Sequence, residues 1–172
     1  QFFYNQNIKT GYTTGTCLYH LTKAQLYLMY NNYDEFIKCI NQSLQYRNGL
    51  TGFIYDIEID IYYCITLIFT KKKNKVLNKT ISKLKKLSEH SPHNFIHYYY
   101  FLVTIKAYIN NDNFLSYSDR TIEHLKSYGS NRILGIFSEL FAYMTKNTHS
   151  IIYKSYLNQA YQAYKSWGAD HK

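Results

Sequence analysis

The chain has 172 residues, which is enough for one compact domain or a short array of repeats but too few for two ordinary domains. Apolar residues make up 46% of it, which excludes a disordered segment, and the presence of only 1 Pro and 7 Gly argues against a turn-rich β-sandwich or barrel. The formal net charge is +9, but only 3 of the 20 basic residues are Arg, so the charge alone does not indicate a protein that binds phosphate groups through Arg.

Eight segments with the periodicity of amphipathic helices follow an N-terminal stretch, 1–15, that we expect to be irregular. In the first of these segments, Leu21, Ala24 and Leu28 recur at the spacing of one buried helix face. Breaks rich in Gly, Asn, Ser and Pro separate the segments. The predicted helices cover 16–30, 33–46, 56–70, 72–88, 93–109, 113–127, 131–146 and 150–167, and 170–172 form the stub of a linker.

The third segment begins with a pattern that is ambiguous between helix and strand. Polar and β-branched residues alternate over 56–61, which by itself is typical of a strand. The continuation through Cys64, Ile65 and Ile68 has helical spacing, and no second strand is present to pair with it. We therefore predict a helix that starts near Asp56, where an acidic side chain favours a helix N-terminus.

Paired in order, the eight helices form four hairpins whose starts lie about 39 residues apart. Helix pairs that recur every 34 to 47 residues or so are typical of α-solenoids of the tetratricopeptide or HEAT kind. The sequence therefore predicts an all-α fold and a single domain over 1–172. Its architecture would be a tetratricopeptide-like α-solenoid of about four antiparallel helical hairpins.

The cysteines and the hydropathy indicate the compartment. Cys17, Cys39 and Cys64 are odd in number and lie inside apolar helical segments, so we expect reduced core thiols in a cytoplasmic protein. No apolar run approaches the roughly 20 residues of a membrane-spanning helix, and no signal peptide opens the chain, so we expect no membrane partner. Because the sequence does not open with Met, we expect a fragment of a longer protein.

A lysine-rich stretch is the strongest local charge feature. Between Lys71 and Lys86 there are 8 Lys and no acidic residue. The stretch is either a contact face for phosphate groups or anionic lipid, or a solvated helix face, which is the interpretation we expect. No Arg or aromatic residue interleaves with the lysines, so nucleic-acid bases have nothing on which to stack. The candidate basic contact face comprises Lys72, Lys75, Lys79, Lys83 and Lys86.

Metal-binding and catalytic motifs are not evident. His93 and His97 are spaced for one helix face, with His90 nearby, but a zinc site needs four good ligands and the zincin motif is missing. We expect these histidines to take part in capping and packing around Pro92. No Gly precedes Lys as in a phosphate-binding loop, and no nucleophile elbow is present. The sequence predicts no enzyme activity, no cofactor and no metal.

Three segments taken together resemble one family. They are 49–55 followed by Tyr62-Tyr63, then 91–97, and finally 156–164 followed by Trp167-Gly168-Ala169. Together they resemble the helical repeat region of large multidomain sensor kinases, over 17–172. The matching structural positions are Gly52, Phe53, Tyr55, Pro92, Asn94, Phe95, His97, Trp167 and Gly168. The chain departs from the family at Ile57, where the family carries Pro, and at Ser91, where it carries Cys.

In that family a Ser/Thr-kinase-like domain and an AAA-type P-loop ATPase precede the repeat region, and a GAF domain and a histidine kinase follow it. The resemblance implies a non-catalytic segment that mediates protein–protein or interdomain contacts in two-component signal transduction. Its partners would be another protein or adjacent domains of the same polypeptide. The alternative is a free-standing basic helical protein that binds nucleic acid or an acidic partner through the 72–86 face, and a degraded pseudogene product is the third hypothesis. We also expect Trp167 to pack on the preceding helix as a terminal cap.

Overall fold

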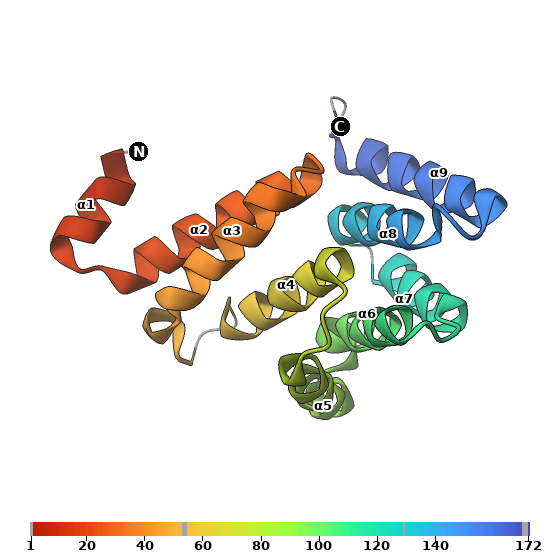
Figure 1. Ribbon diagram of the computed structural model, residues 1–172, viewed down its shortest axis with the longest axis horizontal. Helices are drawn as coiled ribbons and strands as arrows, with labels where there is room; N and C mark the ends of the chain where they lie inside the picture. Colours follow the sequence, from red (N-terminus) through yellow and green to blue (C-terminus); the bar gives the residue numbers. More distant parts are fainter. Residues whose placement is uncertain (1, 53–54, 129, 170–171) are drawn as a thin grey trace. The chain divides into compact units, whose positions relative to one another are not determined.

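The computed structural model describes residues 2–52, 55–128, 130–169 and 172 (Figure 1). Of these residues, 84% lie in helices and none lies in a strand, which confirms the all-α prediction. The chain divides into two compact units, Gln1–Thr70 and Lys71–Lys172, each of which is described by itself.

The first unit, Gln1–Thr70, contains four α-helices and a short 3-10 helix within its described residues. The expectation of an irregular stretch over 1–15 is wrong, because a helix and the start of the next one occupy most of it. Asn, Gln and Thr residues interrupt the aromatic ones in this stretch and leave no clear apolar periodicity, which is why the pattern failed to reveal the helix. The elements are α1 (Phe2–Thr10), α2 (Thr13–Met29), α3 (Tyr33–Gln45), η1 (Arg47–Leu50) and α4 (Tyr55–Thr70).

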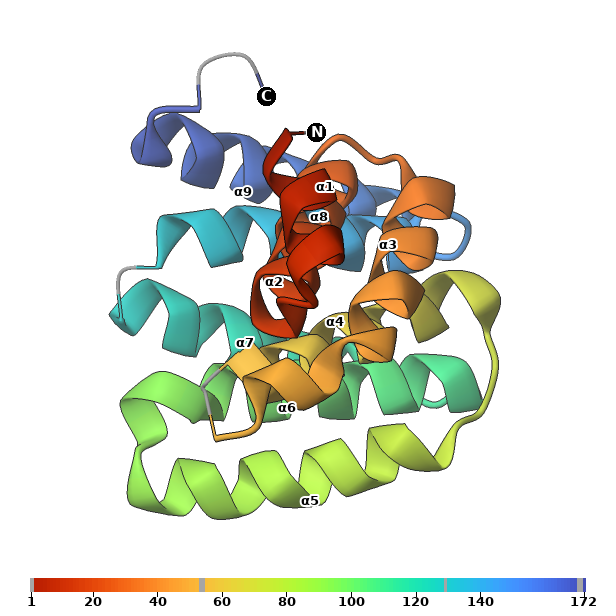
Figure 2. The same ribbon diagram turned by 90° about the vertical axis from the view of Figure 1, so that its left-hand side faces the viewer.

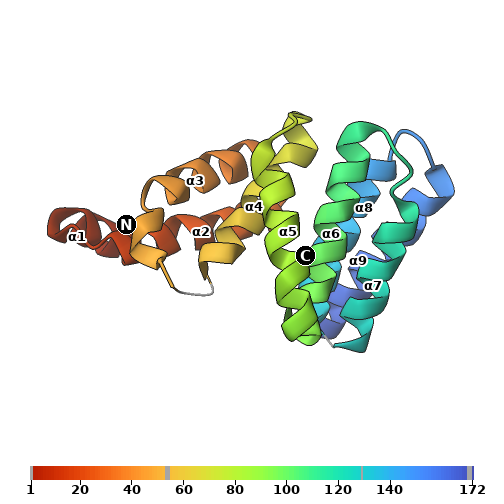
Figure 3. The same ribbon diagram turned by 90° about the horizontal axis from the view of Figure 1, so that it is seen from below.

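Helices α2 and α3 lie side by side and form the predicted first hairpin (Figures 1 and 3). The predicted stripes are buried, with Leu21 and Ala24 on α2 and Phe36 and Ile40 on α3. Asn32 caps α3, because its side-chain oxygen accepts a hydrogen bond from the Glu35 amide at 3.3 Å. The hairpin therefore forms for the reasons that its periodicity indicated.

The ambiguous stretch at 56–61 is helical, as predicted, and belongs to α4. Its alternating acids have a structural role. Arg47 of η1 donates to Asp56 Oδ1 at 2.7 Å and to Asp60 Oδ1 at 2.6 Å, so the two carboxylates share one face of the helix. Side chains four residues apart on a helix are neighbours, which explains how one guanidinium reaches both.

The second unit, Lys71–Lys172, contains five helices within its described residues. They lie side by side in chain order, as Figure 2 shows. The observed bounds of all eight predicted helices lie within 3 residues of those expected. The helices of this unit are α5 (Lys75–His90), α6 (Pro92–Asn110), α7 (Leu115–Ser127), α8 (Asn131–Thr145) and α9 (Ser150–Trp167).

Aromatic contacts join alternate helices of the second unit. The ring of Phe101 on α6 stacks on Phe137 of α8 with centroids 3.6 Å apart. The hydroxyls of Ser118 on α7 and Tyr156 on α9 lie 2.8 Å apart and share a buried hydrogen bond. The hairpin of α6 and α7 is thereby joined to the hairpin of α8 and α9. A tetratricopeptide-like solenoid over the whole chain stays a prediction, as does the single domain.

Candidate interaction surfaces

The lysine-rich stretch forms an exposed stripe on α5. One side of this helix is buried, and it consists of Leu77, Thr80, Leu84 and Ser88. The opposite side carries four exposed lysines, whose positions fall within one face of a helix of 3.6 residues per turn. We call these residues the lysine stripe: Lys75, Lys79, Lys83 and Lys86.

Lys72 does not belong to the stripe, contrary to the prediction. Helix α5 begins at Lys75 and not at residue 72. The reason is Asn74, whose side-chain oxygen accepts a hydrogen bond from the Val76 amide at 2.8 Å and so caps the helix. Lys72 is exposed in the preceding loop, and Lys71 of the same loop places its ammonium 5.7 Å from the ring centroid of Tyr108.

The stripe is a regular row of positive charge. From Lys75 to Lys86 the helix advances by about 16 Å, and neighbouring lysines are about 4.5 to 6 Å apart along the axis. The sequence of α5 contains a single acidic residue, Glu89, in its last turn. The four ammonium groups therefore form a row of positive charge along α5, which is complementary to a row of negative charges at similar spacing.

Three of the family-matching positions lie in the first unit. Gly52 adopts a left-handed backbone with φ of +86°, which favours glycine in the turn before α4. Tyr55 is the first residue of α4 and is exposed. Phe53 lies outside the described residues.

Four other matching positions lie at the start of α6. Pro92 occupies the first turn, as expected, and the side-chain amide of Asn94 donates to Ser91 Oγ at 2.9 Å. Phe95 is half-buried, whereas His97 is only 5% exposed. The Ser91 side chain makes no capping hydrogen bond to α6, and His97 is buried, so a packing role fits His97 while a capping role for His90 and His93 stays a prediction.

His97 is a buried imidazole with unusual surroundings. Neither of its ring nitrogens has a hydrogen-bond partner in the described part of the chain. Burial, and then the nearby His124, lowers the pKa of His97 to about 4. Among the described residues there is no group of three or more His, Cys, Asp or Glu side chains that could hold a metal ion.

A stack of rings beside His97 was not apparent from the sequence. The imidazole of His124 lies parallel to the ring of Tyr100, with centroids 5.4 Å apart, and to that of Tyr128, at 6.1 Å. Tyr128 in turn meets His93 edge-on at 4.5 Å. The four rings come from α6 and from the end of α7, so only the packing of these two segments brings them together.

The C-terminal end of α9 carries Trp167 and Gly168, two of the family-matching positions. Gly168 ends the helix in a left-handed conformation with φ of +84°, as its position indicated. The buried face of α9 consists of Tyr156, Ala160, Ala163 and Tyr164, and Trp167 follows Ala163 by four residues on the same side of the helix. Trp167 is 45% exposed, so its side chain is half-buried, and its packing on the preceding helix as a terminal cap stays a prediction.

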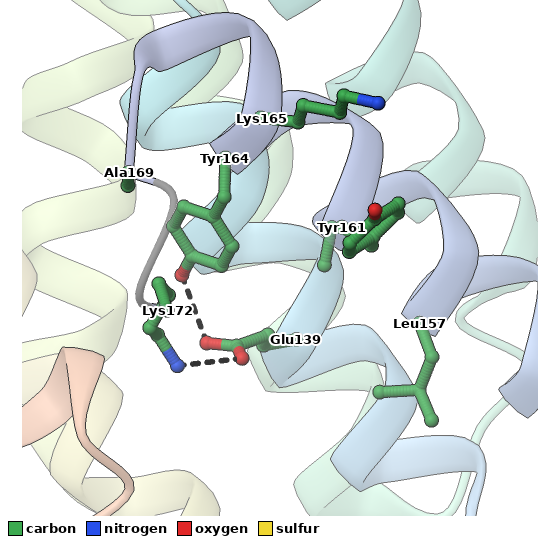
Figure 4. A pocket seen from close by; sticks show the side chains of 8 residues that line it. Glu139, Leu157, Tyr161, Tyr164, Lys165, Ala169 and Lys172 are labelled. Carbon is green, nitrogen blue, oxygen red and sulfur yellow. Dashed lines mark hydrogen bonds and ion pairs between the residues drawn. The ribbon is translucent and has the colours of Figure 1, made fainter.

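A cavity between α8 and α9 is the clearest feature that the sequence did not predict. It encloses about 210 Å³ and is lined by Glu139 of α8 and by residues of α9 and the C-terminal end (Figure 4). Glu139 Oε2 accepts a hydrogen bond from the Tyr164 hydroxyl at 2.8 Å, and its Oε1 lies 2.8 Å from Lys172 Nζ. Lys172 falls within the predicted linker stub, but its side chain is bound in this cavity; 170 and 171 lie outside the described residues.

The cysteines are placed as structural residues. Cys17, Cys39 and Cys64 are all buried in the first unit, as predicted. Burial raises the pKa of Cys17 and that of Cys39, which lowers the fraction of reactive thiolate at neutral pH. These thiols are therefore poor nucleophiles.

Comparison of the chain with models of known protein families, with well-characterised proteins and with solved structures finds no match. The likeness to the repeat region of sensor kinases thus depends on the motifs alone. None of the described helices combines the length and apolarity that crossing a bilayer requires.

Proposed function

We propose that this chain is a non-catalytic helical segment that makes protein–protein contacts, and that the lysine stripe of α5 binds an acidic segment of a partner protein. The observation that carries the proposal is the division of α5 into two faces. Its apolar side is buried, while four lysines at helical spacing stay exposed on the other side. The buried side holds α5 in place, and an exposed row of like charge favours association with a surface of opposite charge.

An acidic protein partner fits the stripe better than a nucleic acid does. Lysines about 4.5 to 6 Å apart along a helix match Asp or Glu side chains that recur every third or fourth residue on a partner helix. Nucleic-acid surfaces favour Arg for bidentate phosphate contacts and aromatic rings for base stacking. Helix α5 contains neither kind of residue.

The test measures the binding of a fluorescein-labelled helical peptide with four Glu residues at the spacing of the stripe. Charge reversal of Lys79→Glu with Lys83→Glu should weaken binding about tenfold, because two attractions of a few tenths to 1 kcal/mol each become repulsions. The control Lys126→Glu with Lys154→Glu makes the same change of net charge at exposed positions of α7 and α9. Fluorescence anisotropy at low and moderate salt gives the affinities.

Two results would contradict this proposal. An equal loss of affinity in both double variants would show that binding follows net charge and not the stripe. Tighter binding of a labelled single-stranded DNA of similar length, lost in the stripe variant, would favour the nucleic-acid function instead.

The resemblance to sensor kinases suggests a wider context for this contact role. We propose that the helices form part of a tetratricopeptide-like repeat region in a cytoplasmic signalling protein, between an ATPase and a GAF or histidine-kinase module. The fit of Pro92, Gly52 and Gly168 to turns and helix ends supports this context. The reading frame on both sides of the chain is the test. An upstream phosphate-binding loop and a downstream kinase core are expected, and flanking sequence with neither rejects the proposal.

A further inference from the structure

We propose that the cavity between α8 and α9 is a pocket for the side chain of a lysine, and that it binds a lysine of a partner polypeptide when Lys172 of this chain vacates it. The pocket lies in the second unit, between helices that do not carry the lysine stripe, so its binding of a lysine does not depend on the function proposed for that stripe. Its lining includes the polar residues Glu139, Tyr164 and Lys172, together with Leu157, Ala160 and Tyr161.

The charged end of the pocket has the groups that recognise an ammonium. The Nζ atom of Lys172 lies 2.8 Å from Glu139 Oε1 and 5.1 Å from the centroid of the Tyr164 ring. A carboxylate supplies a charge-assisted hydrogen bond, and an aromatic face attracts a cation within about 6 Å. The side chain of Lys172 is only 7% exposed and that of Glu139 21%, so this pair is largely shielded from solvent.

Helix α8 is shaped to hold Tyr164 in place. Gly135 and Glu139 are four residues apart and share one face of α8. A Cβ at Gly135 would lie 2.6 Å from Tyr164 Cε1, so the absence of a side chain lets the tyrosine ring rest directly on the helix backbone. From there the hydroxyl donates to Glu139 Oε2 at 2.8 Å and fixes the orientation of the carboxylate.

The remaining wall suits the aliphatic part of a lysine. In Figure 4, Tyr161 and Leu157 lie on the side of the cavity opposite Tyr164 and Lys172, and Lys165 points away from Glu139. Long basic side chains bury their methylene groups along such apolar surface while the charged end reaches a polar partner. An arginine pairs best with both oxygens of a carboxylate, but Glu139 Oε2 already accepts a hydrogen bond from Tyr164. A lysine needs only the Oε1 atom and therefore fits this pocket better.

The experiment uses two small probes and the full chain. The first probe is Nα-acetyl-lysine methylamide, which offers one lysine side chain on a neutral backbone. The second is the norleucine analogue, which has a similar aliphatic chain but no ammonium. Binding is followed by the chemical shifts of residues that line the cavity in Lys172→Met, in wild type and in the control Lys154→Met, whose exposed lysine lies on α9 outside the cavity.

Lys172→Met should bind the lysine probe saturably and about tenfold more tightly than wild type or Lys154→Met, because the tethered Lys172 competes at high effective concentration. Adding Glu139→Gln to Lys172→Met should abolish this binding. If that double variant does not fold, as judged by its circular dichroism, Lys172→Met with Tyr164→Phe should weaken the binding instead. Three outcomes would overturn the pocket: no binding to Lys172→Met, equal binding of the norleucine probe, or affinity that does not change when the partners of the ammonium are altered.

Discussion

At the scale of single residues, the buried imidazole of His97 couples folding to pH. Its pKa is lowered from 6.5 to about 4, so the folded chain keeps this ring neutral where the unfolded chain would protonate it. The contribution of the neutral ring to the free energy of unfolding is fully present above about pH 6.5. It is lost as the pH falls from about 6.5 towards 4, because the unfolded chain then binds a proton that the folded chain does not. Each unit of pKa shift corresponds to about 1.4 kcal/mol, which sets an upper limit of roughly 3 kcal/mol for the loss.

The test of this pH dependence is urea denaturation between pH 7.5 and pH 4 or so. His97→Phe should show a shallower decline than wild type, since the ring has no hydrogen-bonded nitrogen among the described residues that Phe would leave unpaired. His124 on α7 and His93 on α6 lie beside the same rings and are present in both proteins, so the comparison isolates the change at position 97. Parallel curves for the two proteins would contradict the prediction.

At Gly135 the close contact between the backbone of α8 and the ring of Tyr164 matters more than the low helix propensity of glycine. Replacing Gly by Ala in a helix interior ordinarily stabilises by about 1 kcal/mol. Here the new Cβ would approach the ring of Tyr164 to 2.6–2.9 Å, and overpacking in a well-packed core costs about 1–3 kcal/mol. Gly135→Ala should therefore lower the melting temperature.

A second measurement separates the clash from any general effect of the substitution. In a Tyr164→Ala background the ring is removed, so Gly135→Ala should become neutral or stabilising there. The four melting temperatures of this cycle give the coupling between the two sites. A stabilising Gly135→Ala in the wild-type background would show that the two helices separate at little cost.

At the scale of elements, the guanidinium of Arg47 fixes η1 to α4. It donates to Asp56 and to both carboxylate oxygens of Asp60, and the Asp60 side chain is only 12% exposed. Arg47→Met should cost about 2 kcal/mol, because it leaves a largely buried carboxylate without its cation. The matched control is Lys38→Met, which removes an exposed pair with Glu35 and should change the unfolding free energy little. Equal losses in the two variants would contradict this role.

The sequence was most informative where one helix carries its own pattern. The helices of the two units are recognisable from apolar spacing and from caps such as Asn32 and Gly168. Helix α1 was missed because its Asn- and Gln-rich sequence has no clear apolar stripe. Periodicity within α9 does not reveal what covers its last turn, so the packing of the half-buried Trp167 on the preceding helix stays a prediction.

Sites formed by more than one helix could not be predicted from the apolar periodicity of the sequence. The lysine stripe lies on one helix, so its sequence predicted it, apart from Lys72, which the Asn74 cap excludes. The cavity joins Glu139 to Tyr164 and Lys172, which are 25 and 33 residues away along the chain. Only the close packing of α9 on α8 unites them, and the one local clue was a glycine four residues before a glutamate.

At the scale of the whole molecule, contacts concentrate within two units. The second unit has its own aromatic core around Phe101, Phe137 and Phe141, together with the buried Tyr156 on α9. We therefore expect residues 71–172 to fold when expressed alone, with the helical circular dichroism of this unit and one cooperative thermal transition. A broad, non-cooperative loss of helix in this fragment would contradict the prediction.

The distribution of two rare residue types gives each unit its own spectroscopic reporter. All 3 cysteines of the chain are buried in the first unit, at Cys17, Cys39 and Cys64, and the sole tryptophan, Trp167, belongs to the second. Thiol labelling during unfolding therefore reports when the first unit opens, while indole emission reports on the end of the second. Coincident midpoints would mean that the native chain unfolds as one cooperative body, and separated midpoints would measure how much less stable one unit is than the other, without any change to the sequence.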